Sequence, residues 1–287
     1  MAETSAPSTD VAPDSVFVHH GKNWQATALS SGPWDPRAQH GGAPAALCVH
    51  LAEQAMPDEG WQMSRLSLEL IKPVPVASLT SQIDVHSGRS TCRLTIDLFA
   101  SDILVARAHA LLVRRQDVSL PADVAGWDPA HMTPLPAQCG APLVIPGMPV
   151  RTSFYHSAMD HRLAQGNSNQ AGPAAAWFRL TVPLIRGHEN TPAMRAAAAA
   201  DFGSGVSWVI SPQQYLFSNA DLSVHLHRPA MGEWIGVMAQ TQIQSCGVGT
   251  TLTRLFDEHG PIGVASQTLV VRERPATPSP APHKNSS

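Results

Sequence analysis

Two adjacent glycines, Gly41 and Gly42, stand just before Pro44, at the predicted start of a helix. Proline suits the first turn of a helix, where its missing N–H costs no hydrogen bond. The backbone N–H groups of that turn have no partner within the helix, and the helix dipole favours negative charge beside them. Glycines also let a ligand approach the backbone closely. This segment therefore predicts a site that can stabilise an oxyanion.

Several histidines could take part in chemistry. His40 precedes the two glycines, where it would either contact a substrate or cap and pack the helix. His225 and His227 alternate along one predicted strand close to Asp221, which superficially suggests a metal or hydratase site. A metal would need a third ligand at a clear spacing, and the sequence offers none. We therefore expect neither a metal nor an organic cofactor.

Nucleophile motifs are missing from the sequence. A serine hydrolase of the α/β type would carry GxSxG, and residues 203–205, GSG, are the nearest approach to it. Asp201, Phe202 and Gly203 are typical of a helix C-terminus, with Gly203 as the cap. The four cysteines are widely separated and form no CxxC pair, so we interpret them as buried free thiols.

The chain contains an internal repeat with an offset of 156 residues. Residues 66–73, LSLELIKP, are echoed at this offset by residues 222–229, LSVHLHRP, and residues 112–114, LVR, are echoed at an offset of 158 by residues 270–272, VVR. The two longer segments favour strands, and each ends in a proline, as expected where a strand leaves its sheet. A repeat of this length indicates two duplicated domains packed together, because the units of solenoids are much shorter.

Each half has a predicted helix before its repeated strand. The first begins near Pro44 and runs to about Met56; in the second, Thr191 is the expected N-cap and Pro192 the first helical residue before an alanine run. Helices so rich in small residues lack a broad polar face, so we expect a sheet to wrap closely around them. One helix followed by antiparallel strands, twice, is an α+β plan.

The expected domain organisation has five segments. Residues 16–115 and 171–275 form the two repeats, and the proline-rich residues 116–170 form a crossover linker that is packed in part. Residues 1–15 and 276–287 have a disordered composition.

Composition excludes some classes of function. At 287 residues and 43% hydrophobic, the chain can bury one large core or two smaller ones. A net charge of -3 provides no basic field, so we expect no nucleic-acid partner. The N-terminal residues lack the pattern of a secretion signal, and no stretch of about 18 apolar residues occurs. We expect a cytoplasmic protein without a membrane span.

Three stretches carry a family resemblance. They are residues 32–42, with GPWDP and QHGG; residues 217–234, with FSNADL, HRP and EW; and residues 247–269, with GVG, Asp257, Gly260 and QTL. Together they resemble the double-hotdog acyl-CoA thioesterase II family, in particular its actinobacterial members, over about residues 15–275. The resemblance implies a double hotdog, in which each half wraps a long antiparallel sheet around one helix, and hydrolysis of an acyl thioester.

The catalytic set of that family is an Asp, a Thr or Ser, and a Gln. These positions fall here on Asp221, Thr241 and Gln267. The resemblance implies that the carboxylate takes a proton from water while the other two side chains hold the water. An Asp with an ordinary pKa of about 3.9 is a weak base, so burial that raises the pKa of Asp221 would help.

The resemblance also places a single site between the two hotdogs. The helix start at Gly41 and Gly42 would supply oxyanion donors from one hotdog, and the base would come from the other. At the repeat offset Asp221 corresponds to Arg65, so the first half lacks a second base. We therefore expect one active site per chain.

Two other functions remain open. A hotdog hydratase or dehydratase would use a characteristic pair of Asp and His, which the sequence does not reveal. A non-catalytic protein that binds acyl thioesters would also keep the fold. The expected partners are acyl-CoA or an acyl-carrier protein, together with further copies of the chain in a homodimer or higher homo-oligomer, because an open sheet needs cover.

Overall fold

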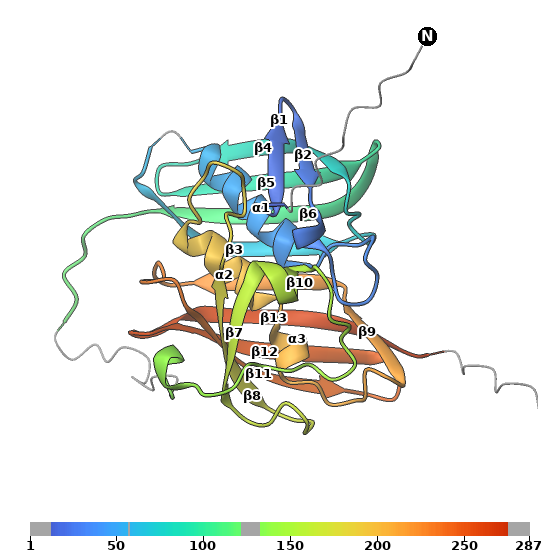
Figure 1. The fold of residues 1–287 in the computed structure, drawn as a ribbon. Coiled ribbons are helices and arrows are strands. Elements are labelled where there is room, and N and C mark those ends of the chain that lie inside the picture. Colours follow the sequence, from blue (N-terminus) through green and yellow to red (C-terminus); the bar gives the residue numbers. More distant parts are fainter. Residues whose placement is uncertain (1–12, 57, 122–132, 275–287) are drawn as a thin grey trace, which may run out of the picture.

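A computed structural model describes residues 13–56, 58–121 and 133–274. Within these ranges the strands form one 13-stranded antiparallel sheet whose order is β1-β2-β4-β5-β6-β3-β10-β13-β12-β11-β8-β7, with β9 paired to β13 (Figure 1). The strands of the first half are β1 Phe17–His20, β2 Asn23–Ala26, β3 Trp61–Leu70, β4 Ser78–Ser87, β5 Thr91–Ala100 and β6 Ile103–Arg114. Those of the second half are β7 Met159–Gln165, β8 Ala174–Leu180, β9 Tyr215–Asn219, β10 Asp221–Leu226, β11 Ile235–Ile243, β12 Val248–Asp257 and β13 Gly260–Glu273.

The two repeats meet at the ladder between β3 and β10. Ser67 pairs with Ser223 in this antiparallel register, and their hydroxyl oxygens are 3.3 Å apart. These residues are equivalent positions of the sequence repeat, so the ladder relates the two halves by an approximate two-fold axis. The α+β double-hotdog architecture expected from the sequence is confirmed.

Two helices lie side by side against the inner face of the sheet (Figure 1). Helix α1 spans Gly42–Gln54, and helix α2 spans Pro192–Ala200. Every residue of α1 from Gly42 to Ala52 is buried, as expected for a helix without a polar face. The predicted N-cap of α2 is confirmed, because the Thr191 hydroxyl accepts a hydrogen bond from the N–H of Met194 at 3.2 Å.

The helices run antiparallel, so the start of each lies beside the end of the other. At one crossing, a Cβ added to Gly42 would fall on the carbonyl oxygen of Ala198 in α2. At the other crossing, the Thr191 hydroxyl donates to Oε2 of Glu53 at 2.8 Å. Burial raises the pKa of Glu53, and the hydrogen bond from Thr191 opposes this only in part.

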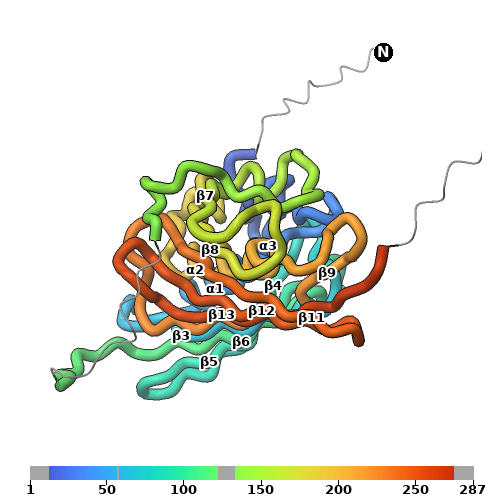
Figure 2. Tube along the Cα trace, turned by 90° about the horizontal axis from the view of Figure 1, so that it is seen from below, coloured from blue at the N-terminus to red at the C-terminus, as the bar shows by residue number. Residues whose placement is uncertain are grey.

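The segment after residue 133 covers the side of the helices that faces away from the central strands (Figure 2). It includes a π-helical turn at Phe154–Ala158, whose Tyr155 hydroxyl donates to the carbonyl of Leu143. Strand β7 lies inside the segment that we expected to be a linker, and it pairs with β8 at the end of the sheet. This segment therefore contributes to the second half as well as connecting the two.

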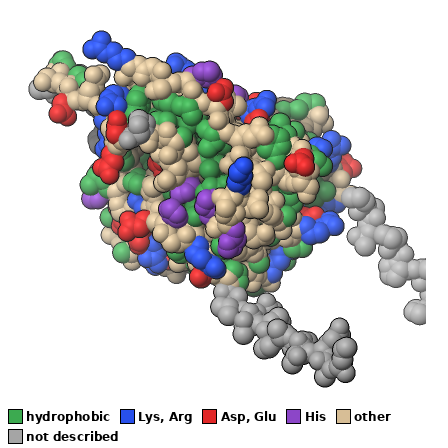
Figure 3. Space-filling view, turned by 90° about the horizontal axis from the view of Figure 1, so that it is seen from above, with side chains coloured by type: hydrophobic (Ala, Val, Ile, Leu, Met, Phe, Trp, Pro, Cys, Tyr) green, Lys and Arg blue, Asp and Glu red, His purple; other side chains and the backbone are tan. Residues whose placement is uncertain are grey.

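The predicted disordered ends fall mainly on residues 1–12 and 275–287, which lie outside the described residues. Within the described part, Ser15 is buried and Asp14 pairs with Arg186 at 2.6 Å. No helix among the described residues has the length and apolar character needed to cross a membrane. Positive and negative side chains are interspersed over the face in Figure 3.

Candidate active site

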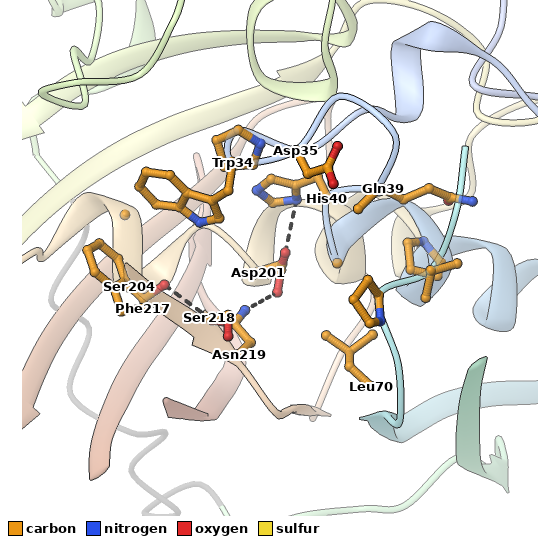
Figure 4. A pocket seen from close by; sticks show the side chains of 18 of the residues that line it. Trp34, Asp35, Gln39, His40, Leu70, Asp201, Ser204, Phe217, Ser218 and Asn219 are labelled. Carbon is orange, nitrogen blue, oxygen red and sulfur yellow. Dashed lines mark hydrogen bonds and ion pairs between the residues drawn. The ribbon is translucent and has the colours of Figure 1, made fainter. Parts of the chain in front are cut away.

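A cavity of about 400 Å³ opens where the two halves meet. Its wall combines the loop before α1, the residues that follow β3, the end of α2 and the end of β9. Residues of the covering segment, including Met148, complete it. Figure 4 shows Trp34, His40, Asp201 and Asn219 around this space. The chain therefore forms its cavity from both repeats.

His40 and Asp201 form a buried hydrogen-bonded pair across the junction of the halves. Nδ1 of His40 lies 2.9 Å from Oδ2 of Asp201, and only 9% and 4% of the two side chains are exposed (Figure 4). Two unprotonated acceptors would repel each other at this distance, so we assign the proton to Nδ1. A pair of Asp and His, which the sequence did not reveal, is therefore present, because one member precedes α1 and the other ends α2.

Further donors surround the Asp201 carboxylate. Nδ2 of Asn219 lies 2.5 Å from Oδ1, and Nε2 of Gln267 lies 3.2 Å from the same oxygen. The backbone N–H of Gly42 is shared between the carboxylate and Nδ1 of His40, which lies 3.1 Å from the amide nitrogen. With His40, these groups supply four donors, which is about the number of lone-pair sites that a carboxylate offers.

The charge of Asp201 follows from these contacts. Burial alone would raise its pKa, but the charge and the hydrogen bond of His40, with the donors Asn219 and Gly42, outweigh burial and lower it. Asp201 also lies beside the N-terminus of α1, where the helix dipole favours an anion. The group is therefore ionised at neutral pH.

The two predicted glycines, Gly41 and Gly42, lie beside the Asp201 carboxylate. A Cβ on Gly41 would come within 2.8 Å of Oδ2 of Asp201, so the close approach belongs to the protein's own carboxylate. The N–H of Gly42 is likewise engaged there. The N–H of Gly41 has no hydrogen-bond partner among the described residues, and Gly41 lines the cavity. Of the two glycines, Gly41 therefore has the N–H that is free for a ligand.

The other ring nitrogen of His40 faces the substrate side. Nε2 has no partner among the described residues and is not sealed in the core, and the imidazole lines the cavity. The ring packs on Phe202, with centroids 4.2 Å apart, and on Phe154, with centroids 5.3 Å apart. An imidazole fixed by two aromatic rings and a carboxylate can exchange a proton through Nε2 in a defined direction.

Gln267 is part of this site, in a supporting position. Its Nε2 donates to the backbone oxygen of Asp201 at 3.0 Å, and its Oε1 accepts the N–H of Ser204 at 3.1 Å. The amide thereby ties the end of α2 to the short helix α3, Gly203–Val206. Gly203 begins α3, whereas the C-cap of α2 is Asp201, so the predicted role of Gly203 as the cap was wrong. A Cβ on Gly203 would lie 2.9 Å from Oε1 of Gln267, and this close packing explains the glycine.

Among the described residues, no hydrogen bond joins the side chains of Asp221, Thr241 and Gln267 to one another. The Asp221 carboxylate accepts the backbone N–H of Thr268 at 2.6 Å. Thr241 belongs to a buried chain of hydroxyls, 2.7 Å from Ser207 and 2.7 Å from Thr251. The Ser207 hydroxyl donates to the carbonyl of Gly203. This row of hydroxyls therefore stabilises α3.

Asp201 and Asn219 are the site residues that sequence reasoning missed. Asp201 follows the alanine run and has the pattern of an ordinary helix end, and Asn219 stands two residues before Asp221. One signal was present, because a carboxylate at a helix C-terminus opposes the dipole of its own helix. Such an unfavourable position suggests a compensating partner, which here is the start of α1. Among the described residues no cluster of side chains could hold a metal ion.

Family models match both halves of the chain. The model of the acyl-CoA thioesterase N-terminal domain matches residues 30–113, and that of the acyl-CoA thioesterase C-terminal domain matches residues 129–271. The chain belongs to the acyl-CoA thioesterase family. A comparison with curated proteins finds no match.

Solved structures agree with this family at the level of the fold. A hot dog protein of unknown function from Alicyclobacillus acidocaldarius is 18% identical, with a TM-score of 0.68, over 91% of this chain and 97% of that one. A provisionally named thioesterase from Novosphingobium aromaticivorans is 20% identical, with a TM-score of 0.67, over 89% and 98%. The acyl-CoA thioesterase II TesB2 of Mycobacterium marinum is 15% identical, with a TM-score of 0.60, over 88% and 98%. This acyl-CoA thioesterase family member thus shares their architecture along its length.

Proposed function

We propose that this protein hydrolyses an acyl-CoA to the free acid and CoA, and that the His40–Asp201 pair provides the proton chemistry. The observation that carries the proposal is the buried pair itself, 2.9 Å apart at the N-terminus of α1 and on the wall of the cavity. Membership of the thioesterase family supports the substrate class.

Within the pair, His40 is the base. Asp201 already receives donors from the side chains of His40, Asn219 and Gln267, so little of its acceptor capacity is left for a proton from water. Its lowered pKa also makes it a weak acceptor. Nε2 of His40, by contrast, is unpartnered at the cavity. Asp201 then orients the imidazole through Nδ1 and stabilises the positive charge that forms on it.

The reaction proceeds by addition and elimination. Nε2 of His40 takes a proton from water as the water oxygen bonds to the carbonyl carbon of the thioester. The carbonyl oxygen becomes an oxyanion, which the free N–H of Gly41 and the start of α1 stabilise. Collapse of the intermediate breaks the C–S bond. The sulfur takes the proton from His40, and acid and thiol are released.

In this proposal Asp201 replaces Asp221 as the functional carboxylate, and Thr241 has a supporting role. Asp221 is held by a backbone N–H of β13 and does not line the cavity. Gln267 keeps a place in the site, since it holds Asp201 and α3 rather than the water.

A matched pair of variants tests the assignment. Release of free thiol from a panel of acyl-CoAs is followed for the wild type, Asp201→Asn and Asp221→Asn, with folding checked by circular dichroism. We expect Asp201→Asn to lose about a hundredfold or more in kcat, because the imidazole loses its orienting charge, and Asp221→Asn to stay near wild type. The reverse pattern would restore Asp221 as the base.

The same pair of side chains favours a second candidate, hydration of an enoyl thioester. In that reaction the water oxygen bonds to Cβ, its proton goes to His40, and His40 returns this proton to Cα. Incubation with crotonyl-CoA separates the candidates, because hydration removes the absorbance of the conjugated enoyl thioester without releasing thiol. We expect thiol release. Loss of absorbance alone would favour the hydratase, and neither change would favour an acyl-thioester-binding protein.

A further inference from the structure

We infer that the cavity favours a short or compact acyl group over a long fatty chain. This inference rests on the proposed function, because it assumes that a thioester reaches His40. Three observations lead to it: the size of the cavity, the closure of its inner wall and the tight packing of its outer wall.

The volume sets the limit. Ligand pockets in proteins have volumes of roughly 300–1,000 Å³, so a cavity of about 400 Å³ lies near the lower end of this range. The thioester and the inner end of the pantetheine arm must occupy part of this space to bring the carbonyl to His40. Only the rest of the cavity then remains for the acyl group.

The inner wall behind His40 is closed by stacked aromatic rings. Phe202 stacks on Phe178 with centroids 4.4 Å apart and on Phe154 at 6.1 Å, in addition to its contact with His40. Phe154 and Phe178 are fully buried. A chain that extended past the reacting carbonyl would have to separate these rings, and overpacking of a filled core is unfavourable.

The outer wall is equally fixed. Ile145 is buried and packs so closely on Gly205 that an added Cβ would lie 3.0 Å from its Cδ1. Trp34 contacts Phe217 edge to face, with centroids 5.5 Å apart. Arg151 secures the loop before Trp34 by donating to the carbonyl of Gly32 at 2.7 Å. These contacts fix much of the outer wall, and Met148 is the flexible side chain of the lining.

The first arm of the test measures kcat/KM for thiol release from acetyl-, butyryl-, hexanoyl-, dodecanoyl- and palmitoyl-CoA. We expect a maximum at butyryl or hexanoyl and a fall of about tenfold or more at dodecanoyl, because the longer chain must overpack the wall. Equal or higher kcat/KM for the long chains would overturn the inference and leave the proposed function intact.

Two variants of the wall shift this limit in opposite directions. Met148→Ala removes a flexible side chain from the lining and should raise kcat/KM for dodecanoyl-CoA relative to butyryl-CoA. Gly205→Ala adds a methyl group beside Ile145 and should lower kcat/KM for hexanoyl-CoA relative to acetyl-CoA. Met231→Ala, at an exposed methionine outside the lining, is the control and should leave the profile unchanged. Identical profiles for all three variants would argue against this wall as the limit.

The second arm separates failure of the inference from failure of the proposed function. If no thiol is released from any acyl-CoA, the proposed function fails, and calorimetric titration with hexanoyl- and dodecanoyl-CoA still measures the size limit. Tighter binding of hexanoyl-CoA would support the limit. Tighter binding of dodecanoyl-CoA would contradict it.

Discussion

Nδ1 of His40 lies 2.9 Å from Oδ2 of Asp201, and the two residues come from opposite halves of the chain. One precedes the first buried helix and the other ends the second, so their contact exists only when both repeats are folded and docked. We therefore expect a change that separates the helix ends to lower the catalytic rate even where each half keeps its own fold.

His40→Ala should lower kcat by a factor of about a hundred to ten thousand, because it removes the proposed base while the oxyanion donor remains. Added imidazole should restore part of the rate, since the vacated space beside Asp201 can accept it. The control is His86→Ala, at an exposed histidine on β4. A folded His40→Ala protein with the wild-type rate, or a loss of rate that imidazole never relieves, would assign His40 to packing.

The lowered pKa of Asp201 predicts how the free energy of unfolding changes at acid pH. Its pKa is lower in the folded protein than the ordinary value of 3.8, because the effect of burial is outweighed by His40, Asn219 and Gly42. The stabilisation is therefore fully present above that ordinary value and is lost as the pH falls below it, through the folded pKa. Urea unfolding between pH 7 and pH 3 should show a difference in free energy between wild type and Asp201→Asn that shrinks at the acid end. A difference that grows toward low pH would refute the assigned direction.

Gly42→Ala should destabilise the protein by about 1–3 kcal/mol and lower its activity, because the new Cβ meets the backbone of Ala198 and forces the helices apart. The matched control is Gly140→Ala, where no atom of the described residues lies within 4 Å of the added Cβ. Thermal unfolding and thiol release measure the two effects. Equal behaviour of both variants would show that the helix crossing has room to relax.

The variant Thr241→Val tests whether the hydroxyl of Thr241 stabilises the fold or takes part in catalysis. Removal of this hydroxyl leaves Ser207 and Thr251 short of a partner, so we expect a loss of about 1–3 kcal/mol in the free energy of unfolding. The kcat of the folded variant should change little. A hundredfold loss of kcat at unchanged stability would instead place Thr241 beside the reacting water, as the family resemblance implies.

Much of the fold was accessible from the sequence. The offset between Ser67 and Ser223 is visible in the strand repeat, and these residues pair across the central ladder. The start of α1 and the N-cap Thr191 followed from local rules that depend on only a few neighbouring residues. Strand β7 was missed because it lies among prolines, in a segment whose composition is typical of a linker.

The site was harder to predict for a physical reason. His40 and Asp201 are far apart in the sequence, and only the antiparallel packing of α1 and α2 brings them together. No spacing rule connects a residue before one helix with a residue after another. Asp221 was predicted as the base because it begins a repeated strand, which is easy to recognise in the sequence. In the structure its carboxylate accepts a hydrogen bond from the backbone N–H of Thr268.

The pair of helices has two crossings, and they now carry different groups: His40 with Asp201 at one, and Thr191 with Glu53 at the other. In a dimer of identical single hotdogs, both crossings would have to be the same, and a mutation at one would appear at the other. Fusion into a single chain removes that constraint. One crossing can therefore hold the pair proposed for proton transfer while the other holds a buried hydrogen bond between the helices, so the two ends of the helix pair can differ.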